Sequence, residues 1–269
     1  MTALSLPQIV DLEQYPIDRL DEPAGRALIE RARTALHAVG ACDLPGFLRP
    51  ETTTAAVESA LSLHDQEYRT DQTHDIEFSG LAPESLPEDD PRRVRIRSAK
   101  EGTAFDAIPA DSPVRLLYES GELLRFVSAA LELEPLYRSD DPLGALNYMY
   151  YLPGDELGWH FDNADFVVTL MLQAPHSGGG FEFAPMLRSA EDRNDEGVRA
   201  LLAGTSDRVR TMSGAPGTLA LFRGHWSPHR VTPVEGERMR VNAVLSYART
   251  PGQSLKEETY RLFYGRIPT

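Results

Sequence analysis

The sequence has few of the features that mark secreted or membrane-bound proteins. It contains a single cysteine, Cys42, which cannot form an internal disulfide bond and therefore fits a reducing compartment. No apolar run approaches the length of a membrane span. The N-terminal residues also lack the basic region that precedes the apolar segment of a secretion signal. We therefore expect a cytoplasmic protein that does not interact with a membrane.

Positive charge is scarce as well. The formal net charge is −14 at pH 7, whereas proteins that bind nucleic acid polymers neutralise phosphates with lysine and arginine. A nucleic acid is therefore disfavoured as a partner, although a nucleotide monomer is not excluded. The apolar content of 41% is ordinary for a globular protein. We expect a small-molecule substrate, and the sequence leaves the oligomeric state open, with a homodimer as one option.

Residues 1–140 have mainly helical patterns. Proline near the start and apolar residues at helical spacing predict helices over residues 23–40, 50–63 and 112–134. Between the second and third of these, residues 65–92 are polar and rich in Asp, Glu and Pro. Such a segment is typical of a long surface loop, which could form a lid over a site. A disordered loop is the alternative.

Residues 141–250 instead have the pattern of short strands separated by turns. The strands are predicted at residues 145–152, 166–172, 181–183, 218–222 and 241–247. A helical insertion is predicted within residues 185–212, and residues 251–269 are expected to close the pocket. The whole chain, 1–269, is therefore predicted to be one α+β domain, in which packed N-terminal helices surround a β-barrel core.

Two histidines and an aspartate form the most informative pattern in the sequence. His160 and Asp162 are two residues apart on an extended segment, so their side chains point to the same side. His229, on a later antiparallel strand, would bring a second imidazole, and His225 would then be a pocket residue. Two imidazoles and a carboxylate that leave the opposite positions open suit oxygen-activating Fe(II). The remaining histidines have helix-surface or loop patterns: His37, His64, His74 and His176.

Two arginines follow on the strand that returns after the turn at residues 235–237. Arg238 and Arg240 alternate, so both point to one face. An arginine inside a mostly apolar barrel is costly unless it pairs with an anion. A dicarboxylic acid that chelates the metal at one end and pairs with arginine at the other would supply that anion. We favour Arg240, because the strand continues unbroken from it, and we expect a solvated position for one of the pair.

The strand at residues 145–152 is expected to add polar groups to the same site, because its alternate residues must face the barrel interior. Asn147 and Tyr151 share one face and could form hydrogen bonds with the carboxylates of the acid. Tyr148 and Tyr150 belong to the other face and are the alternative.

Taken together, these motifs resemble those of the Fe(II)/2-oxoglutarate-dependent oxygenases, and in particular the branch of free-amino-acid hydroxylases and radical halogenases. The resemblance lies in residues 154–160, 179–183, 229–234, 243–247 and 264–266. It implies a double-stranded β-helix, which is a jelly-roll or cupin-like barrel. It also implies Fe(II), 2-oxoglutarate and O₂ as cofactor and cosubstrates, with 2-oxoglutarate split to succinate and CO₂ while an unactivated C–H bond of the substrate is attacked.

The resemblance further implies which product is formed. In the halogenases of this branch Gly or Ala replaces the carboxylate of the metal motif, which opens an iron position for chloride. Asp162 is present here, so we predict hydroxylation. Two alternatives of other kinds are an oxygenase that acts on a carrier-tethered or protein-bound residue, and a metal-binding or ligand-binding barrel without catalysis.

The residues expected around the substrate come from several segments. The resemblance suggests that the carboxylate of an amino acid pairs with an arginine before the barrel, and Arg95 and Arg97 fit that place. Trp159 and Asn163 flank the metal motif, and an Asn at position 163 argues against a cationic substrate side chain. Several aromatic residues could close over the substrate: Trp226, Tyr260, Phe263 and Tyr264.

Overall fold

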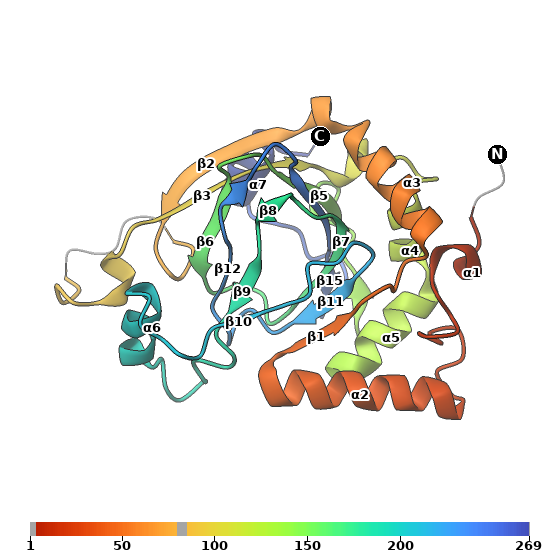
Figure 1. The fold of residues 1–269 in the computed structure, drawn as a ribbon, viewed down its shortest axis with the longest axis horizontal. Helices are drawn as coiled ribbons and strands as arrows, with labels where there is room; N and C mark the ends of the chain where they lie inside the picture. Colours follow the sequence, from red (N-terminus) through yellow and green to blue (C-terminus); the bar gives the residue numbers. More distant parts are fainter. Residues whose placement is uncertain (1–3, 80–84, 269) are drawn as a thin grey trace.

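A curled antiparallel sheet forms the centre of the protein in the computed structural model, which describes residues 4–79 and 85–268. The strands are β1 Ala41–Leu44, β2 Tyr68–His74, β3 Ile96–Thr103, β4 Tyr137–Arg138, β5 Leu146–Tyr151, β6 Glu156–His160, β7 Val167–Gln173, β8 Ser177–Gly178, β9 Phe181–Phe183, β10 Arg210–Thr211, β11 Leu219–Phe222, β12 His229–Val231, β13 Val234–Glu235, β14 Arg240–Leu245 and β15 Tyr247–Ala248. The 11-stranded sheet has the order β1-β11-β7-β14-β5-β3-β6-β12-β9-β10, with β2 paired to β3. The strands of this sheet curl round into a barrel (Figure 1).

Helices cover the outside of this sheet. They are α1 Leu6–Ile9, α2 Pro23–Val39, α3 Pro50–Leu61, α4 Pro113–Glu119, α5 Gly121–Leu131, α6 Asp195–Leu202 and α7 Glu257–Tyr264, with 3-10 turns η1 His64–Gln66, η2 Pro91–Arg93 and η3 Phe105–Ala107. The N-terminal helices, α1 to α5, lie along one outer side of the barrel, and α6 lies on the opposite side (Figure 1). None of the helices in the described parts of the chain has the length and apolar character needed to cross a membrane.

The prediction of one long helix over residues 112–134 is wrong, because the helix is interrupted at Ser120. The backbone of Ser120 is extended, with φ −69° and ψ 139°, and its hydroxyl oxygen accepts a hydrogen bond from the backbone N–H of Leu123 at 3.3 Å. A serine in that conformation caps the start of a new helix. The apolar stripe therefore continues over two helices, α4 and α5, rather than one.

The long loop expected over residues 65–92 is also wrong in its first part. Residues 68–74 form β2, which pairs with β3 in a continuous register from Tyr68↔Gly102 to His74↔Ile96. A tight turn follows, in which an Asp75 carboxylate oxygen accepts hydrogen bonds from the backbone N–H groups of Glu77 and Ser79, each at 2.9 Å. Residues 80–84 lie outside the described part, so the lid remains a prediction.

The two faces of β5 separate the apolar core from the interior of the barrel. On the outer face, the hydroxyl of Tyr148 forms a 2.7 Å hydrogen bond with that of Ser112, and Tyr150 donates to the carbonyl oxygen of Ala60 at 2.7 Å. Both tyrosines belong to the large core between the sheet and the N-terminal helices. The opposite face of β5 is thereby left to line a cavity inside the barrel.

Candidate active site

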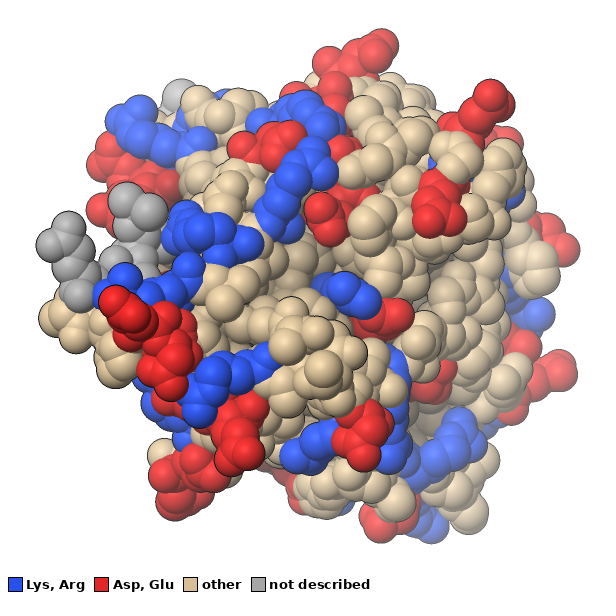
Figure 2. All heavy atoms as spheres, turned by 60° about the vertical axis from the view of Figure 1, so that its left-hand side comes forward, with Lys and Arg blue, Asp and Glu red and all other residues tan. Residues whose placement is uncertain are grey.

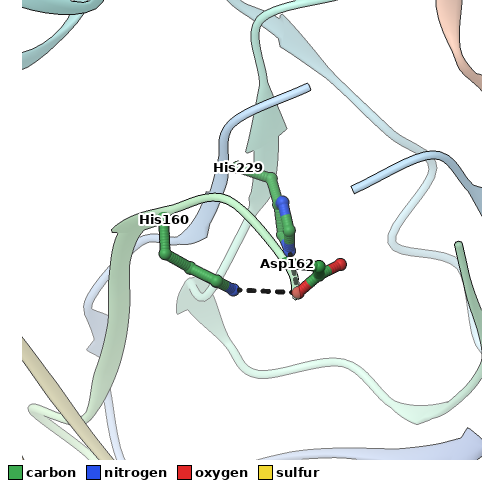
Figure 3. Close-up of side chains that lie close together, drawn as sticks. All are labelled: His160, Asp162 and His229. Atoms are coloured by element: carbon green, nitrogen blue, oxygen red, sulfur yellow. Dashed lines mark ion pairs between the residues drawn. The ribbon is translucent and has the colours of Figure 1, made fainter. Parts of the chain in front are cut away.

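His160 and His229 lie opposite each other on two paired strands of the barrel. They are register partners on β6 and β12, which pair antiparallel. Asp162 follows two residues after His160, and its Oδ1 atom lies 3.5 Å from Nε2 of His160 and 3.6 Å from Nε2 of His229. The three side chains point toward one another from two segments of the chain (Figure 3). One ligand atom from each lies within 4.8 Å of the others, so the group could hold a single metal ion.

Hydrogen bonds fix the tautomers of both histidines. The Nδ1 atom of His160 is 2.8 Å from the carbonyl oxygen of Gly158, and that of His229 is 3.1 Å from the carbonyl oxygen of Ser227. A carbonyl oxygen can only accept, so each Nδ1 atom donates its proton. The Nε2 lone pairs are therefore free and directed toward Asp162, which is the arrangement that metal-binding histidines adopt.

The carboxylate of Asp162 fits a metal ion better than any protein partner. Its Oδ2 atom is buried without a hydrogen-bond partner, which is costly unless something not made of protein neutralises it. Burial raises the pKa of Asp162, but the adjoining His229 and His160 lower it, and the net pKa lies below the ordinary value. Burial lowers the pKa of His229 to about 4. At neutral pH the site thus holds an ionised carboxylate and a neutral imidazole, the forms that bind metals.

A glycine provides the space for this carboxylate. A Cβ atom added to Gly224 would lie 1.8 Å from Oδ2 of Asp162 and 3.0 Å from Cε1 of His229. The backbone N–H of Asp162 also donates to the carbonyl oxygen of Gly224 at 3.2 Å. The loop before β12 is therefore shaped around the aspartate side chain.

A cavity of about 340 Å³ extends from these residues into the barrel. Arg240 lines it from β14 and is only 7% exposed. One of its terminal nitrogens donates to Oδ1 of Asn242, whereas its Nε atom is buried without a partner, and no carboxylate among the described residues pairs with it. Burial lowers the pKa of this guanidinium. An arginine in this setting is costly unless an anion pairs with it. Arg238, in contrast, is exposed.

Asn147 and Tyr151 both line the cavity, as their shared face requires. The side chain of Asn147 is already occupied: its amide donates to the carbonyl oxygen of Leu143 at 2.7 Å, and its oxygen accepts from the hydroxyl of Tyr264 at 3.0 Å. The ring of Tyr151 lies 5.3 Å from the guanidinium carbon of Arg240. Tyr151 is therefore better placed than Asn147 to meet a ligand beside Arg240.

Most of the residues expected around the substrate do not reach this cavity. Arg97 is exposed and pairs with Asp71 at 2.9 Å, and Arg95 is exposed and donates to the backbone oxygen of Thr73. Figure 2 shows a face of the molecule on which positive and negative side chains are interspersed. Both arginines therefore lie at the surface, contrary to the expectation.

The two tryptophans are also outside the cavity lining. Trp159 points to the opposite side of β6 from the cavity, where the guanidinium of Arg230 covers its ring at 4.9 Å. Trp226 contacts the ring of His225 at 4.6 Å. Asn163 does line the cavity, as do Phe263 and Tyr264 of α7, whereas Tyr260 packs beside the Asp141 carboxylate.

Three residues near the metal group were not expected from the sequence. Phe78 follows β2 with φ 55° and stands edge-on to the ring of His160 at 4.9 Å. His74 is buried and stacks on Phe78 at 4.2 Å, and Lys100 lines the cavity from β3. Alternation along residues 96–103 could have indicated Lys100, because that stretch is a strand whose side chains point to two opposite faces.

Comparison with known families decides the assignment of the chain. The model of a family described as Halogenase D matches residues 25–263. The chain belongs to this family. In this Halogenase D family member, the group formed by His160, Asp162 and His229 agrees with the resemblance to Fe(II)/2-oxoglutarate oxygenases that the sequence motifs suggest. A search of curated proteins gives no match.

Solved structures resemble the family member in fold. The non-haem α-ketoglutarate-dependent epimerase SnoN from nogalamycin biosynthesis is 12% identical with a TM-score of 0.56, and the match covers 83% of each chain. A prolyl hydroxylase from Trichoplax adhaerens is 16% identical with a TM-score of 0.52, covering 85% of this chain and 94% of that one. A Pseudomonas putida prolyl-4-hydroxylase is 15% identical with a TM-score of 0.50, covering 81% and 97%. The expected double-stranded β-helix fold is confirmed.

Proposed function

We propose that this Halogenase D family member is a hydroxylase of an unactivated C–H bond in a free amino acid. In this proposal His160, Asp162 and His229 bind Fe(II), and Arg240 binds the distal carboxylate of 2-oxoglutarate. The observation that carries it is the half-buried Asp162 carboxylate, which lies within 3.6 Å of both imidazoles and retains an unpartnered oxygen. With O₂ and 2-oxoglutarate, the bound iron supplies the oxidising power that breaks a C–H bond.

The protein itself would orient the reactants and limit water. His160, Asp162 and His229 all line the cavity, so they would hold a metal ion at its wall. Phe181 stacks on the ring of His229 at 5.3 Å, and Phe222 meets that ring edge-on at 4.8 Å. These contacts hold the imidazole in place and cover it with apolar surface, as a reaction site that must exclude water requires.

Asp162 favours hydroxylation over halogenation, although the family is described by a halogenase. Its carboxylate would occupy the metal position that chloride needs in a halogenase. Gly224 leaves space for this carboxylate, because a Cβ atom at position 224 would lie 1.8 Å from Oδ2 of Asp162. A protein oxygen would therefore occupy the position, and the substrate carbon would receive a hydroxyl group.

Two successive measurements test the proposal. First, anaerobic addition of Fe(II) and 2-oxoglutarate should produce the visible charge-transfer absorption of the chelate. Second, a panel of free amino acids, with and without chloride, should be scored by succinate release and product mass. We expect a product heavier by one oxygen atom. A chlorinated main product would overturn the hydroxylase assignment, and absence of the absorption band would overturn the metal and cosubstrate assignment. Competition between free and carrier-tethered amino acid distinguishes the two forms of substrate.

A further inference from the structure

Lys100 is a buried cation in the wall of the cavity. It lies on β3 between Ser98 and Gly102, on the face that points into the barrel, and it is 7% exposed. The neighbouring Glu101 points to the other face, where it pairs with Arg69 and His64. The alternation of the strand therefore directs the ammonium of Lys100, and not the carboxylate beside it, toward the metal group.

No described residue pairs with this ammonium. Its Nζ atom lies 5.5 Å from the ring centre of Phe78 and 5.4 Å from that of Phe263, and no hydrogen bond or ion pair engages it within residues 4–79 and 85–268. Ring faces attract a cation, but they do not replace its hydrogen bonds. A mostly buried ammonium that meets no protein acceptor is costly to maintain, which points to a ligand that supplies acceptors inside the cavity.

The cavity lining carries more positive than negative charge. Its described lining contains two cations, Lys100 and Arg240, and one carboxylate, Asp162. A divalent metal with doubly charged 2-oxoglutarate adds no net charge, so the loaded cavity keeps one positive charge. A substrate with a negative group would neutralise it, whereas a cationic side chain would meet repulsion without any second carboxylate to pair with.

We propose that Lys100 binds a carboxylate or phosphate group of the substrate and excludes substrates with a cationic side chain. This inference rests on the proposed function and gives it a substrate class: an amino acid or related compound with a net negative charge. Arg95 and Arg97, which the sequence suggested for this role, are at the surface, and Lys100 takes their place at the cavity.

The surroundings of Lys100 separate it from the site proposed for 2-oxoglutarate. Burial lowers the pKa of Lys100 to about 8, and the charge that opposes this effect is that of Asp162 at the metal group. Arg240 instead lies over the ring of Tyr151, with its guanidinium carbon 5.3 Å from the ring centre. The two cations thus face different parts of the cavity. Lys100 lies on the side of Phe78 and α7, from which Phe263 also contributes to the lining.

The scarcity of lysine makes the test direct. The sequence contains only two lysines, Lys100 and the exposed Lys256. Protein labelled with ¹³C at the lysine Cε atoms should give two NMR signals, and Lys256 serves as the internal reference. The protein would be loaded with diamagnetic Zn(II) and 2-oxoglutarate and titrated with pH. The probes are L-glutamate and L-2-aminoadipate for carboxylate, adenosine 5′-monophosphate for phosphate, and L-lysine for a cationic side chain.

We expect at least one anionic probe to raise the pKa of Lys100 by about one unit or more while Lys256 is unchanged, because a nearby anion stabilises the charged form. The probe that succeeds identifies carboxylate or phosphate as the recognised group. The inference is overturned if no anionic probe changes the Lys100 signal, or if L-lysine binds as tightly as the anions. This readout needs no turnover, so its failure is distinct from failure of the hydroxylase proposal.

Substitution provides the second readout. Lys100→Met removes a buried charge at nearly constant length, so the fold should persist, as circular dichroism would verify. Its affinity for the anionic probe should fall about 10-fold to 100-fold, whereas Lys256→Met should bind normally. Affinity for 2-oxoglutarate, from the absorption of the Fe(II) chelate, should be the same in all three proteins. A Lys100→Met protein that loses 2-oxoglutarate instead would reassign Lys100 to the cosubstrate.

Discussion

His160 and His229 face each other across two antiparallel strands, with ring centres 4.1 Å apart. Because they are register partners, the pairing of β6 with β12 alone brings together residues that are far apart in the sequence. Each ring is also held by a backbone carbonyl two residues before it, Gly158 and Ser227 respectively. The metal group is therefore built mainly by strand pairing, and it should exist before any metal binds.

The glycine beside Asp162 should be essential for metal binding. In Gly224→Ala the new methyl group would overlap Oδ2 of Asp162 and force the carboxylate away. We expect Fe(II) affinity to fall by about 10-fold to 100-fold, measured by titration under anaerobic conditions. Gly214→Ala is the matched control, because nothing lies within 4 Å of a Cβ atom at that position. Equal metal affinity in the two variants would contradict the proposed role of Asp162.

Arg240 should determine affinity for 2-oxoglutarate. Arg240→Met removes the unpaired guanidinium from the cavity, and loss of its charge-assisted hydrogen bonds should weaken binding by about 10-fold to 150-fold. The chelate absorption, titrated with 2-oxoglutarate, measures this effect. Arg238→Met removes an exposed arginine two residues earlier and should leave affinity unchanged. If Arg238→Met weakened the binding of 2-oxoglutarate and Arg240→Met did not, Arg238 would be the residue that binds it.

Replacement of Asp162 by glycine should abolish hydroxylation. The variant loses one of three proposed ligands and opens a metal position into the cavity, so chloride or water could enter it. Product masses in the presence and absence of chloride would detect whether any remaining activity has changed its outcome. Full hydroxylase activity in Asp162→Gly would show that the carboxylate is not a ligand.

His74 should make the metal-free protein less stable in acid. Burial lowers its pKa from 6.5 to about 4, so between these values the unfolded chain binds a proton that the folded chain does not. Stability from this group is complete above pH 6.5 and decreases as the pH falls toward 4, by up to about 3 kcal/mol. Urea unfolding at pH 7 and pH 4.5 measures the loss, and it should be smaller in His74→Gln. An equal pH dependence in both proteins would exclude this contribution.

The metal pattern and Arg240 could be predicted because both depend on local alternation along a strand. An extended segment was enough to predict that His160 and Asp162 point to the same side. The continuous strand after Arg240 was enough to predict that Arg240 points into the barrel. The substrate side could not be predicted in the same way. β3 runs from Ile96 to Thr103, and alternation along it places Arg97 at the surface and Lys100 in the cavity lining.

Residues 68–74 were predicted to lie in a loop because their side chains are polar, but they form a strand. This segment is rich in charged and hydroxyl side chains, and its strand structure depends on pairing with β3 rather than on an apolar face of its own. The same pairing buries His74, whose neighbours in the sequence are polar. The break at Ser120 was hidden for a related reason, since the apolar spacing of α4 and α5 continues across it.

Helix α7 could allow the substrate preference of this protein to change during evolution. Thr259, Phe263 and Tyr264 of α7 line the cavity, whereas the metal group and Arg240 belong to the barrel. α7 follows the last strand of the sheet and adds no strand to it, so this helix could be exchanged while the sheet keeps its topology. The part of the cavity lining that α7 contributes is thus separate from the reaction centre, and exchanging α7 between relatives offers a route to new substrate preferences on an unchanged barrel.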